Sequence, residues 1–319
     1  MNKKIMKLLI TGDTGLLGAA LVAELLQSQS YEIFGVSKAA SDGLVDWDHR
    51  SVDLTDAPAT LRYLDDVHPD CVIHCAAATD VERCETQQAQ AWKVNVDATE
   101  LLAQWASQNG ARFTFISTDS VFDGTQGAYR EEDPPGPLNH YARTKLAGER
   151  VAARWCPHSL IVRTNFYGWN MSGKPNLAKW IHGKLIWQES LKAFVDVCFS
   201  PLFVNDAAKL ILELISQDGK EIFHVGARES CSKYEFAMLL ARELQLDTGK
   251  IQPILLEEAR FHAQRPRNTS LAAGKCAQFL GRKMPTVEQG IRVFARTIAR
   301  NKSTQFEKSK VQSVELASR

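Results

Sequence analysis

Tyr141 and Lys145 are separated by three residues, a spacing suited to acid–base chemistry when both lie on one helix. Residues four apart in a helix share a face, one turn from each other. A lysine ammonium beside a phenol favours the tyrosinate and lowers the phenol pKa from its usual value of about 10 toward neutrality. We therefore predict that this pair acts as a general acid–base.

Thr118 is predicted to complete this set. It follows the apolar run 112–117, a predicted strand that precedes the helix of Tyr141. In a parallel sheet the carboxyl end of such a strand faces the ligand crevice. The Thr118 hydroxyl would then donate a hydrogen bond to a substrate carbonyl while Tyr141 transfers the proton, so we predict Thr118, Tyr141 and Lys145 as the catalytic residues.

The run Thr11-Gly-Asp-Thr-Gly-Leu-Leu-Gly18 follows a predicted strand and opens a predicted helix. In that context one glycine permits a tight turn, another lets the backbone approach a pyrophosphate, and the third lets helix and strand pack closely. The helix N-terminus offers free N–H groups and a partial positive charge. The loop therefore predicts a dinucleotide site, contacted by the residues Gly12, Thr14, Gly15, Leu16 and Leu17, with Gly18 as the third glycine.

The end of the second strand predicts which nicotinamide cofactor binds. NAD-binding proteins carry an acidic residue there for the ribose 2′-hydroxyl. This chain has Ser37 and Lys38 instead, and a hydroxyl with a cation suits a 2′-phosphate. We predict NADPH, with NADH as the alternative because Asp42 is close in sequence. Asp53 and Leu54 follow a further apparent strand and are predicted to contact the adenine.

Short apolar runs alternate with helical patterns along the chain. Strands are predicted at 7–11, 32–36, 71–77, 112–117, 159–163 and 221–225, and helices at 16–27, 60–66, 89–107, 141–155 and 205–216. Such repeats, with strands apolar on both faces, predict a doubly wound parallel α/β sheet of the Rossmann type with a smaller, discontinuous substrate lobe. The predicted division is 1–165 with about 201–226 for the cofactor domain, about 166–200 and 227–300 for the lobe, and 301–319 as a disordered tail.

Composition limits the classes of partner. The 319 residues carry a formal net charge of +1 and are 45% hydrophobic, typical of a globular protein. A balanced charge predicts neither a nucleic-acid nor a membrane partner. The N-terminal apolar run is too short for a signal peptide, so a cytoplasmic protein is expected. Seven scattered cysteines fit a reducing compartment. No ligand spacing predicts a metal site, and His74 is interpreted as a buried structural histidine.

These motifs and several others together resemble the dTDP-4-dehydrorhamnose reductase family, which belongs to the extended short-chain dehydrogenases. The resemblance reaches from the glycine loop to about Gly281. Besides that loop it rests on His74-Cys-Ala-Ala-Ala-Thr79, Asn95-Val-Asp97, Ser117-Thr-Asp-Ser-Val-Phe-Asp-Gly124, Pro137-Leu-Asn-His-Tyr-Ala-Arg-Thr-Lys-Leu-Ala-Gly-Glu149, Arg163-Thr164, Tyr167-Gly168 and Arg265-Pro-Arg-Asn-Thr-Ser-Leu271.

The resemblance implies an NADP(H)-dependent reductase that delivers hydride to C4 of a 4-keto-6-deoxy sugar on a nucleoside diphosphate. Tyr141 would be the proton donor, with Lys145 as its partner and as a ligand of the nicotinamide ribose. Further cofactor contacts would be Ala76, Ala77, Ala78 and Asn95. Substrate contacts would be Thr79, Asp119, Val121, Phe122, Asn165 and Arg265. A homodimer is a possible assembly.

Some features leave alternatives open. Ser120 stands where the family usually has tyrosine, and Ala142 where it has glycine, which affects the substrate more than the chemistry. An epimerase or dehydratase remains possible. So does a non-catalytic regulatory role, because the beta subunit of methionine adenosyltransferase resembles the same family. Arg163, Arg265 and Arg267 are candidates for the substrate diphosphate or for structural ion pairs. The tryptophans Trp169, Trp180 and Trp187 are candidates for stacking or for packing.

Overall fold

The computed structural model describes residues 5–28, 30–38, 47–169 and 176–298. Its centre is a sheet of seven strands in the order β11-β6-β5-β4-β1-β2-β3, with every neighbouring pair parallel. The strands are β1 (Met6–Thr11), β2 (Tyr31–Ser37), β3 (Asp48–Ser51), β4 (Cys71–His74), β5 (Arg112–Thr118), β6 (Leu160–Thr164) and β11 (Glu221–Val225). The order reverses between β1 and β4, which is where doubly wound folds bind nucleotides.

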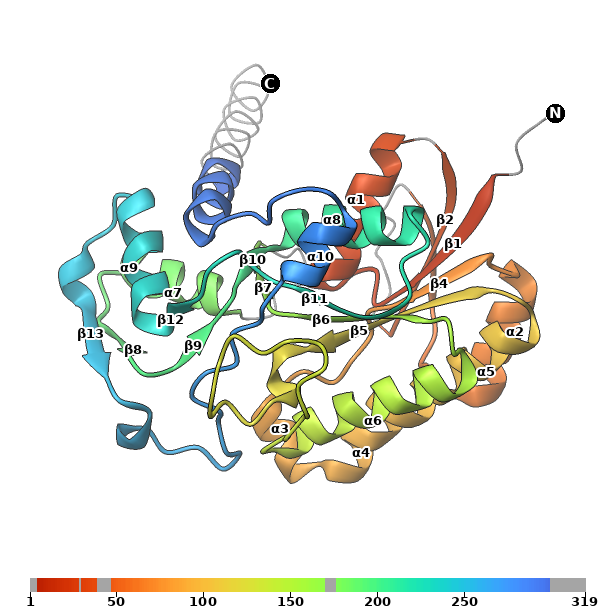
Figure 1. The fold of residues 1–319 in the computed structure, drawn as a ribbon, viewed down its shortest axis with the longest axis horizontal. Coiled ribbons are helices and arrows are strands. Elements are labelled where there is room, and N and C mark those ends of the chain that lie inside the picture. The colour runs from red at the N-terminus through yellow and green to blue at the C-terminus, as the bar shows by residue number, and fades with distance from the viewer. Residues whose placement is uncertain (1–4, 29, 39–46, 170–175, 299–319) are drawn as a thin grey trace, which may run out of the picture.

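Helices cover both faces of this sheet, which is why its central strands are apolar on both sides. Figure 1 shows α1 and α8 together on one face, and α5 and α6 with α2 on the other. The helix bounds are α1 (Leu16–Ser28), α2 (Ala57–Val67), α5 (Ala98–Gln108), α6 (His140–Trp155) and α8 (Val204–Ser216). The predicted doubly wound parallel sheet is thus confirmed. None of the helices in the described ranges is long and apolar enough to cross a membrane.

The sequence prediction differed from the structure in three places. The apparent strand before Asp53 was given no bounds, because Asp-His-Arg-Ser of β3 has no apolar pattern. Strand β4 ends at His74 instead of Ala77, because the Ala76 N–H donates to the Thr11 side-chain hydroxyl (3.1 Å) and not to a backbone carbonyl of β1. The helix predicted at 89–107 is α4 (Gln88–Trp92) and α5, joined by a π-helical turn at Lys93–Asp97.

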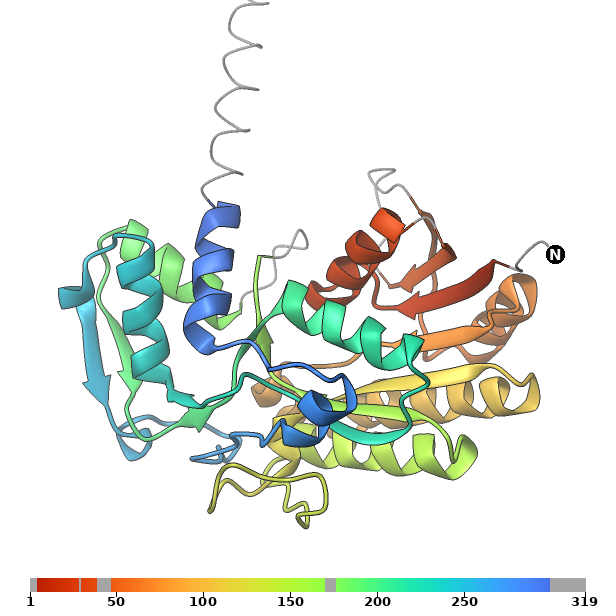
Figure 2. The ribbon, with the colours of Figure 1, turned by 45° about the horizontal axis from the view of Figure 1, so that its top comes forward.

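A smaller lobe lies beside one end of the sheet (Figures 1 and 2). It contains the helices α7 (Leu177–Ile186) and α9 (Lys233–Glu243), the parallel pair β8 (Leu191–Phe194) and β13 (Ile251–Ile254), and the antiparallel pair β9 (Cys198–Phe199) and β12 (Cys231–Ser232). Its two halves come from the ranges predicted for the substrate lobe. One later element returns to the sheet, since α10 (Gly274–Phe279) packs on β11. The predicted tail at 301–319 lies outside the described residues.

A buried ion pair joins α6 to the sheet. Glu149 accepts two hydrogen bonds from the Arg163 guanidinium (2.9 and 2.7 Å) and one from the Ser117 hydroxyl (2.5 Å). The side chains of Arg163 and Glu149 are only 3% and 4% exposed. Arg163 is therefore a structural residue beneath the site. The alternative that it contacts a substrate diphosphate does not fit this geometry.

Removing one partner of this pair should destabilise the protein strongly. Glu149→Ala leaves a buried guanidinium without its counter-ion, so we expect a loss of about 3–5 kcal/mol in the free energy of unfolding. The matched control is Glu288→Ala, which breaks the exposed pair with Arg292 and should cost less than about 0.5 kcal/mol. Denaturant unfolding followed by circular dichroism measures both. Equal losses in the free energy of unfolding would show that the buried ion pair stabilises the protein no more than the exposed pair does.

Candidate active site

The glycine loop between β1 and α1 is shaped by close backbone contacts. Gly12 has a φ of +69°, its N–H donates to the Val36 carbonyl (2.6 Å), and its carbonyl accepts from the Gly15 N–H (2.8 Å). A Cβ on Gly12 would lie 2.9 Å from the Ala76 Cα, and one on Gly18 only 2.2 Å from the Gly12 oxygen. The loop therefore closes only with glycine, and it leaves a backbone cradle at the start of α1 that suits a pyrophosphate.

A chain of hydrogen bonds connects this loop to the next strand. The Thr11 hydroxyl lies 2.7 Å from His74 Nδ1, and His74 Nε2 lies 3.0 Å from the Thr99 hydroxyl. Thr99 itself donates to the Asn95 carbonyl (2.8 Å), so it accepts from His74, which is neutral with its proton on Nε2. Burial lowers the pKa of His74 to about 3. This geometry supports the interpretation of His74 as a structural residue.

Asn95 stabilises the loop that forms one side of the predicted cofactor crevice. Its side-chain oxygen accepts from the Ala78 N–H (2.8 Å), while its amide donates to the Ala78 carbonyl (3.0 Å) and to the Thr144 hydroxyl (2.9 Å). Its side chain is buried, and the π-helical turn directs it to this position. Asn95 thereby fixes the loop of Ala76–Ala78 against α6. We propose that it positions the cofactor site instead of touching the cofactor.

The end of β2 carries the residues predicted to select the cofactor. The Thr14 hydroxyl donates to the Ser37 hydroxyl (3.0 Å), which places both beside the glycine loop. Lys38 pairs with Asp53 (2.7 Å), and this hydrogen bond lowers the pKa of the Asp53 carboxyl. Asp53 therefore faces the lysine in this structure, and Leu54 packs against the core. Asp42 lies outside the described residues.

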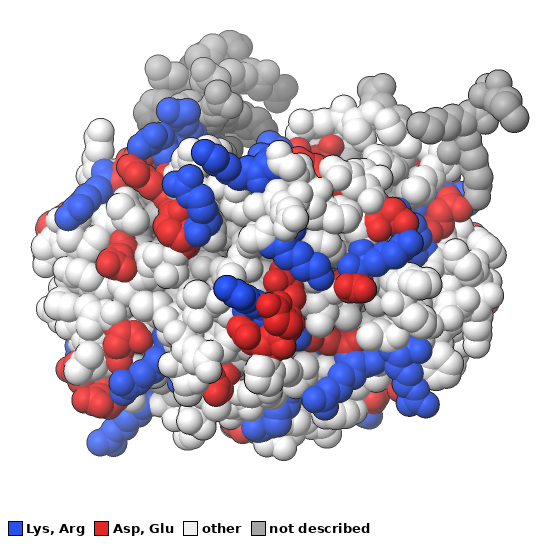
Figure 3. Space-filling model, in the orientation of Figure 1, with Lys and Arg blue, Asp and Glu red and all other residues white. Residues whose placement is uncertain are grey.

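A cavity opens beside Lys38. All its charged lining residues are basic, namely Lys38, Arg83 of α3 (Val81–Thr86) and Lys93. The remaining lining residues are neutral and mostly polar. On the face seen in Figure 3, acidic and basic side chains are interspersed without a broad field of one sign. A local cluster of three cations is therefore a distinctive feature, and it suits an anionic group such as a phosphate.

The three predicted catalytic residues lie together. Thr118 ends β5, and Asn139 caps α6 by accepting from the Ala142 N–H (2.9 Å), so that Tyr141 lies in the first helical turn. The Thr118 hydroxyl hydrogen-bonds to the Tyr141 phenol. The Lys145 ammonium lies one turn further, 4.1 Å from the centre of the Phe115 ring. Strand and helix thus bring the three side chains to one end of the sheet.

The protonation of this set differs from the sequence prediction. Burial raises the pKa of Tyr141 above its usual range, and the Thr118 hydrogen bond opposes this only in part. Burial also lowers the pKa of Lys145 to about 8, against the opposing effect of Glu149. Lys145 therefore does not bring the phenol pKa toward neutrality in this structure, because desolvation dominates both groups. Tyr141 stays protonated at neutral pH, the form that a proton donor requires.

Asp119 is the buried acceptor at the centre of the site. Its Oδ2 accepts from the Asn165 amide (2.9 Å) and the Thr269 hydroxyl (2.8 Å), and its Oδ1 from the Thr118 hydroxyl (3.1 Å). Asp119 and Asn165, both predicted to bind substrate, thus face each other. Because Thr269 belongs to a distant segment, the carboxylate also connects β5 to the later part of the chain.

Two other predicted substrate residues are enclosed by protein. Val121 and Phe122 are fully buried in a small cluster with Tyr129 and Leu271. The Phe122 ring stacks on Tyr129 with centroids 4.1 Å apart. We propose that both support the loop after Thr118 and do not contact the substrate. Thr79, by contrast, is exposed just before α3.

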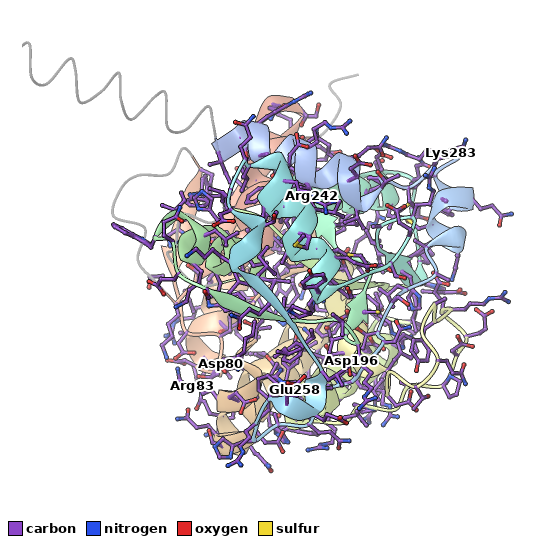
Figure 4. The ribbon with its side chains drawn as sticks, turned by 90° about the vertical axis from the view of Figure 1, so that its left-hand side faces the viewer. Asp80, Arg83, Asp196, Arg242, Glu258 and Lys283 are labelled. Atoms are coloured by element: carbon purple, nitrogen blue, oxygen red, sulfur yellow. The ribbon has the colours of Figure 1, made fainter. Side chains whose placement is uncertain are left out.

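Arg265 is held at the rim of the site by α3. It forms an ion pair with Glu82 (2.7 Å) and lies over the Phe261 ring. Arg267 is more exposed and lies 3.8 Å from Asp196. Both arginines line a second cavity with Phe261. Figure 4 views the molecule from the lobe and shows Asp196 and Glu258 near its lower side.

The predicted tryptophans lie largely at the surface. Trp169 and Trp180 are partly exposed, and Trp187 is 78% exposed. Trp169 packs edge-on against His182 and lies near the Lys179 ammonium. The structure thus gives packing contacts for Trp169 and an open position for Trp187.

The sequence analysis missed Asp13 as a structural part of the glycine loop. Its buried carboxylate accepts from Trp47 Nε1 (2.8 Å) and lies 2.6 Å from His49 Nδ1. It occupies the space above Gly35, where a Cβ would be 2.0 Å from Asp13 Oδ2. The available signal was an acidic residue inside the loop together with a glycine inside the next strand. Lys233 was also missed and is considered below.

A methyl group on Gly12 should abolish cofactor binding. Gly12→Ala introduces a Cβ against the Ala76 backbone and strains a positive φ. Gly110→Ala is the matched control, since Gly110 has nearly the same φ (+68°) but open space around it. Gly110→Ala should lose about 1–2 kcal/mol of stability from its positive φ, and Gly12→Ala should lose more because of the added clash. Only Gly12→Ala should lose NADPH binding measured by fluorescence titration. Unchanged NADPH binding in Gly12→Ala would refute the assignment of the glycine loop as the pyrophosphate site.

The switch-point crevice and the glycine cradle define a Rossmann-type dinucleotide-binding fold, with the tyrosine and lysine pair at one end of its sheet. The chain belongs to the RmlD substrate binding domain family, whose model matches residues 6–300. This match confirms the resemblance to the dTDP-4-dehydrorhamnose reductases. In the described part of the chain, no group of three or more His, Cys, Asp or Glu side chains is arranged to hold a metal ion.

Individual relatives agree with this assignment. A probable low-salt glycan biosynthesis reductase from Haloferax volcanii is 31% identical over 88% of this chain and 95% of its own length. Methionine adenosyltransferase 2 subunit beta from Pongo abelii is 31% identical over 88% of this chain and 84% of its own. Among solved structures, dTDP-4-dehydrorhamnose reductase from Bacillus anthracis in complex with NADP superposes with a TM-score of 0.81, at 28% identity, over 91% of this chain and 98% of that one.

Proposed function

We propose that this protein is an NADPH-dependent reductase of the C4 keto group of a 6-deoxy sugar linked to a nucleoside diphosphate. The observation that carries the proposal is the Thr118, Tyr141 and Lys145 set at the carboxyl end of β5, beside the glycine cradle. The family membership and the reductase relatives support it.

The residues of the chain have distinct roles in this reaction. When bound, the reduced nicotinamide supplies the hydride. The Thr118 hydroxyl, which donates to Asp119 in this structure, would turn on substrate binding to donate its hydrogen bond to the keto oxygen and thereby orient it. Tyr141, protonated at neutral pH, donates its proton to the same oxygen as the alcohol forms. Lys145, charged below a pKa of about 8, stabilises the phenolate that remains.

The residues present fit a dinucleotide with a 2′-phosphate. Gly12 and Gly15 would form the cradle for the pyrophosphate, since a side chain at Gly12 would meet the Ala76 backbone and one at Gly15 the Gly12 carbonyl. Ser37 and Lys38 end β2, where the 2′ position of the adenosine ribose is recognised in this fold. Arg83 and Lys93 add positive charge in the same cavity as Lys38. This cluster is why we propose NADPH and not NADH.

The cofactor preference can be tested at Lys38. Lys38→Ala removes one charge-assisted hydrogen bond to a phosphate, so the KM for NADPH should rise about 10- to 100-fold. NADH lacks the 2′-phosphate and serves as the internal control, with a KM changed less than about threefold. Steady-state kinetics with the two cofactors gives both values. An equal rise for both would assign Lys38 a purely structural role.

A regulatory role without catalysis is the second candidate. The match to the methionine adenosyltransferase 2 beta subunits is the observation that favours it. The complete set of Thr118, Tyr141 and Lys145 favours the reductase. The two functions separate in one assay, because a regulatory subunit would bind NADPH without oxidising it.

The deciding experiment follows NADPH oxidation against a panel of dTDP- and UDP-linked 4-keto-6-deoxy sugars. We expect turnover with at least one member. Tyr141→Phe should then lower kcat by about 100- to 10,000-fold, because the proton donor is lost, while NADPH affinity changes less than about threefold. Full activity of Tyr141→Phe would remove the assigned acid. NADPH binding without turnover on any sugar would favour the regulatory role.

A further inference from the structure

Lys233 is the first residue of α9 and the lobe fixes its position from several sides. The antiparallel pairing of β9 and β12 precedes it, and its own N–H donates to the Val197 carbonyl (2.9 Å). Ser232 and Glu235 form a capping box at this end of α9, with bonds of 3.0 and 2.7 Å. Because Glu235 is used in the cap, the helix supplies no counter-ion to Lys233.

The Lys233 ammonium lacks a direct polar partner. It lies over the face of Phe199, 3.1 Å from the ring centre, and Phe199 is itself buried. Within the described ranges no side chain or carbonyl accepts a hydrogen bond from this ammonium, and no carboxylate forms an ion pair with it. The Lys233 side chain is only partly exposed, and a cation with this little contact with water is stabilised by an added hydrogen-bond acceptor. A ring face supplies only part of that stabilisation.

The acidic group that acts on Lys233 is Asp119, and it is already occupied. Asp119 stabilises the charged lysine through space. Its carboxylate oxygens, however, accept from Asn165, Thr269 and Thr118. The neighbouring thiols of Cys198 and Cys231 are neutral, since burial raises the pKa of both. The hydrogen-bonding capacity of the ammonium is therefore left for a ligand.

The same carboxylate links Lys233 to the reacting end of the site. Asp119 follows Thr118 directly, and its charge also acts on the Tyr141 phenol. The hydrogen bonds connect the same segments: Thr269, which donates to Asp119, also donates its N–H to the Cys198 carbonyl (3.0 Å), and Cys198 pairs with Ser232, the residue before Lys233. Arg265, in contrast, stands at the rim with Glu82. Lys233 thus belongs to the sugar end of the site and not to the rim.

We propose that Lys233 is a substrate-binding residue, whose ammonium donates hydrogen bonds to hydroxyl oxygens of the sugar ring next to the keto carbon. This inference rests on the proposed function. Asp119 already supplies a negative charge nearby, so the ligand that completes the site is a neutral oxygen and not a carboxylate. Lys233 would then tie the substrate lobe to the sugar while Thr118 and Tyr141 hold the keto oxygen.

The test uses the full chain and dTDP-4-dehydrorhamnose as the probe. Lys233→Met keeps the length of the side chain but removes the donors, so the KM for this sugar should rise about 10- to 100-fold. The KM for NADPH and the affinity for dTDP alone should stay within about threefold. Lys233→Arg should restore most of the sugar affinity. Lys275→Met is the matched control, because Lys275 also lies over an aromatic ring, Phe223, but packs on β11.

The pH dependence provides a readout that a packing role would not change. Burial lowers the pKa of Lys233 to about 8, so the ammonium is lost as pH rises through that value. The KM for the sugar should therefore rise above pH 8 in the unmodified protein but not in Lys233→Arg, whose guanidinium stays charged. Lys145 titrates in the same range. Since it is present in every variant, the difference between the profiles reports Lys233.

The outcomes separate this inference from the proposed function. An active parent protein whose Lys233→Met variant keeps its KM for the sugar would overturn the role of Lys233 alone. An equal loss of affinity for dTDP and for the sugar nucleotide would also overturn it, since the contact would then lie outside the sugar. A parent protein that binds NADPH but neither binds nor reduces any sugar nucleotide would overturn both. Melting curves confirm that the variants are folded.

Discussion

Beyond the ends of β1 and β4, the backbones of Gly12 and Ala76 come so close that a single methyl group would not fit between them. This close approach lets the Thr11 hydroxyl accept a hydrogen bond from the Ala76 N–H and donate one to His74 Nδ1. These side-chain hydrogen bonds replace the backbone hydrogen bonds between the two strands at this point. The cofactor cradle, its Asn95 support and the start of α6 all depend on this contact.

Buried carboxylates hold the catalytic strand in place from two directions. Glu149 fixes α6 to β5 and β6 through Ser117 and Arg163. Asp119 fixes the end of β5 to Thr269 in the later segment. Each carboxylate adjoins a residue of the catalytic set along the chain or along the helix. The positions of the catalytic side chains are therefore fixed by buried hydrogen bonds and a buried ion pair. Such buried interactions hold side chains more firmly than exposed ones.

The fold and the central site could be predicted because their signals are local. The glycine loop, the spacing of Tyr141 and Lys145, and apolar strands each fall within a short stretch of sequence. The bounds of the edge strand β3 could not be predicted because it is largely exposed and carries no apolar pattern. The pKa of Tyr141 was predicted in the wrong direction, because desolvation depends on the packed surroundings and not on spacing. The setting of Lys233 required contacts between segments that are distant in the chain.

The bond between Thr269 and Asp119 also bears on the order in which the protein is completed during synthesis. Domains generally fold as the chain emerges, with N-terminal parts first. The strands of the cofactor side, β1 to β6, are all made before residue 165, whereas Thr269 comes more than a hundred residues later. A nascent or truncated chain could thus form its glycine loop while Asp119, next to Thr118, still lacked the hydrogen bond from Thr269. Competence for chemistry is in this sense conferred by a segment that is translated well after the catalytic residues.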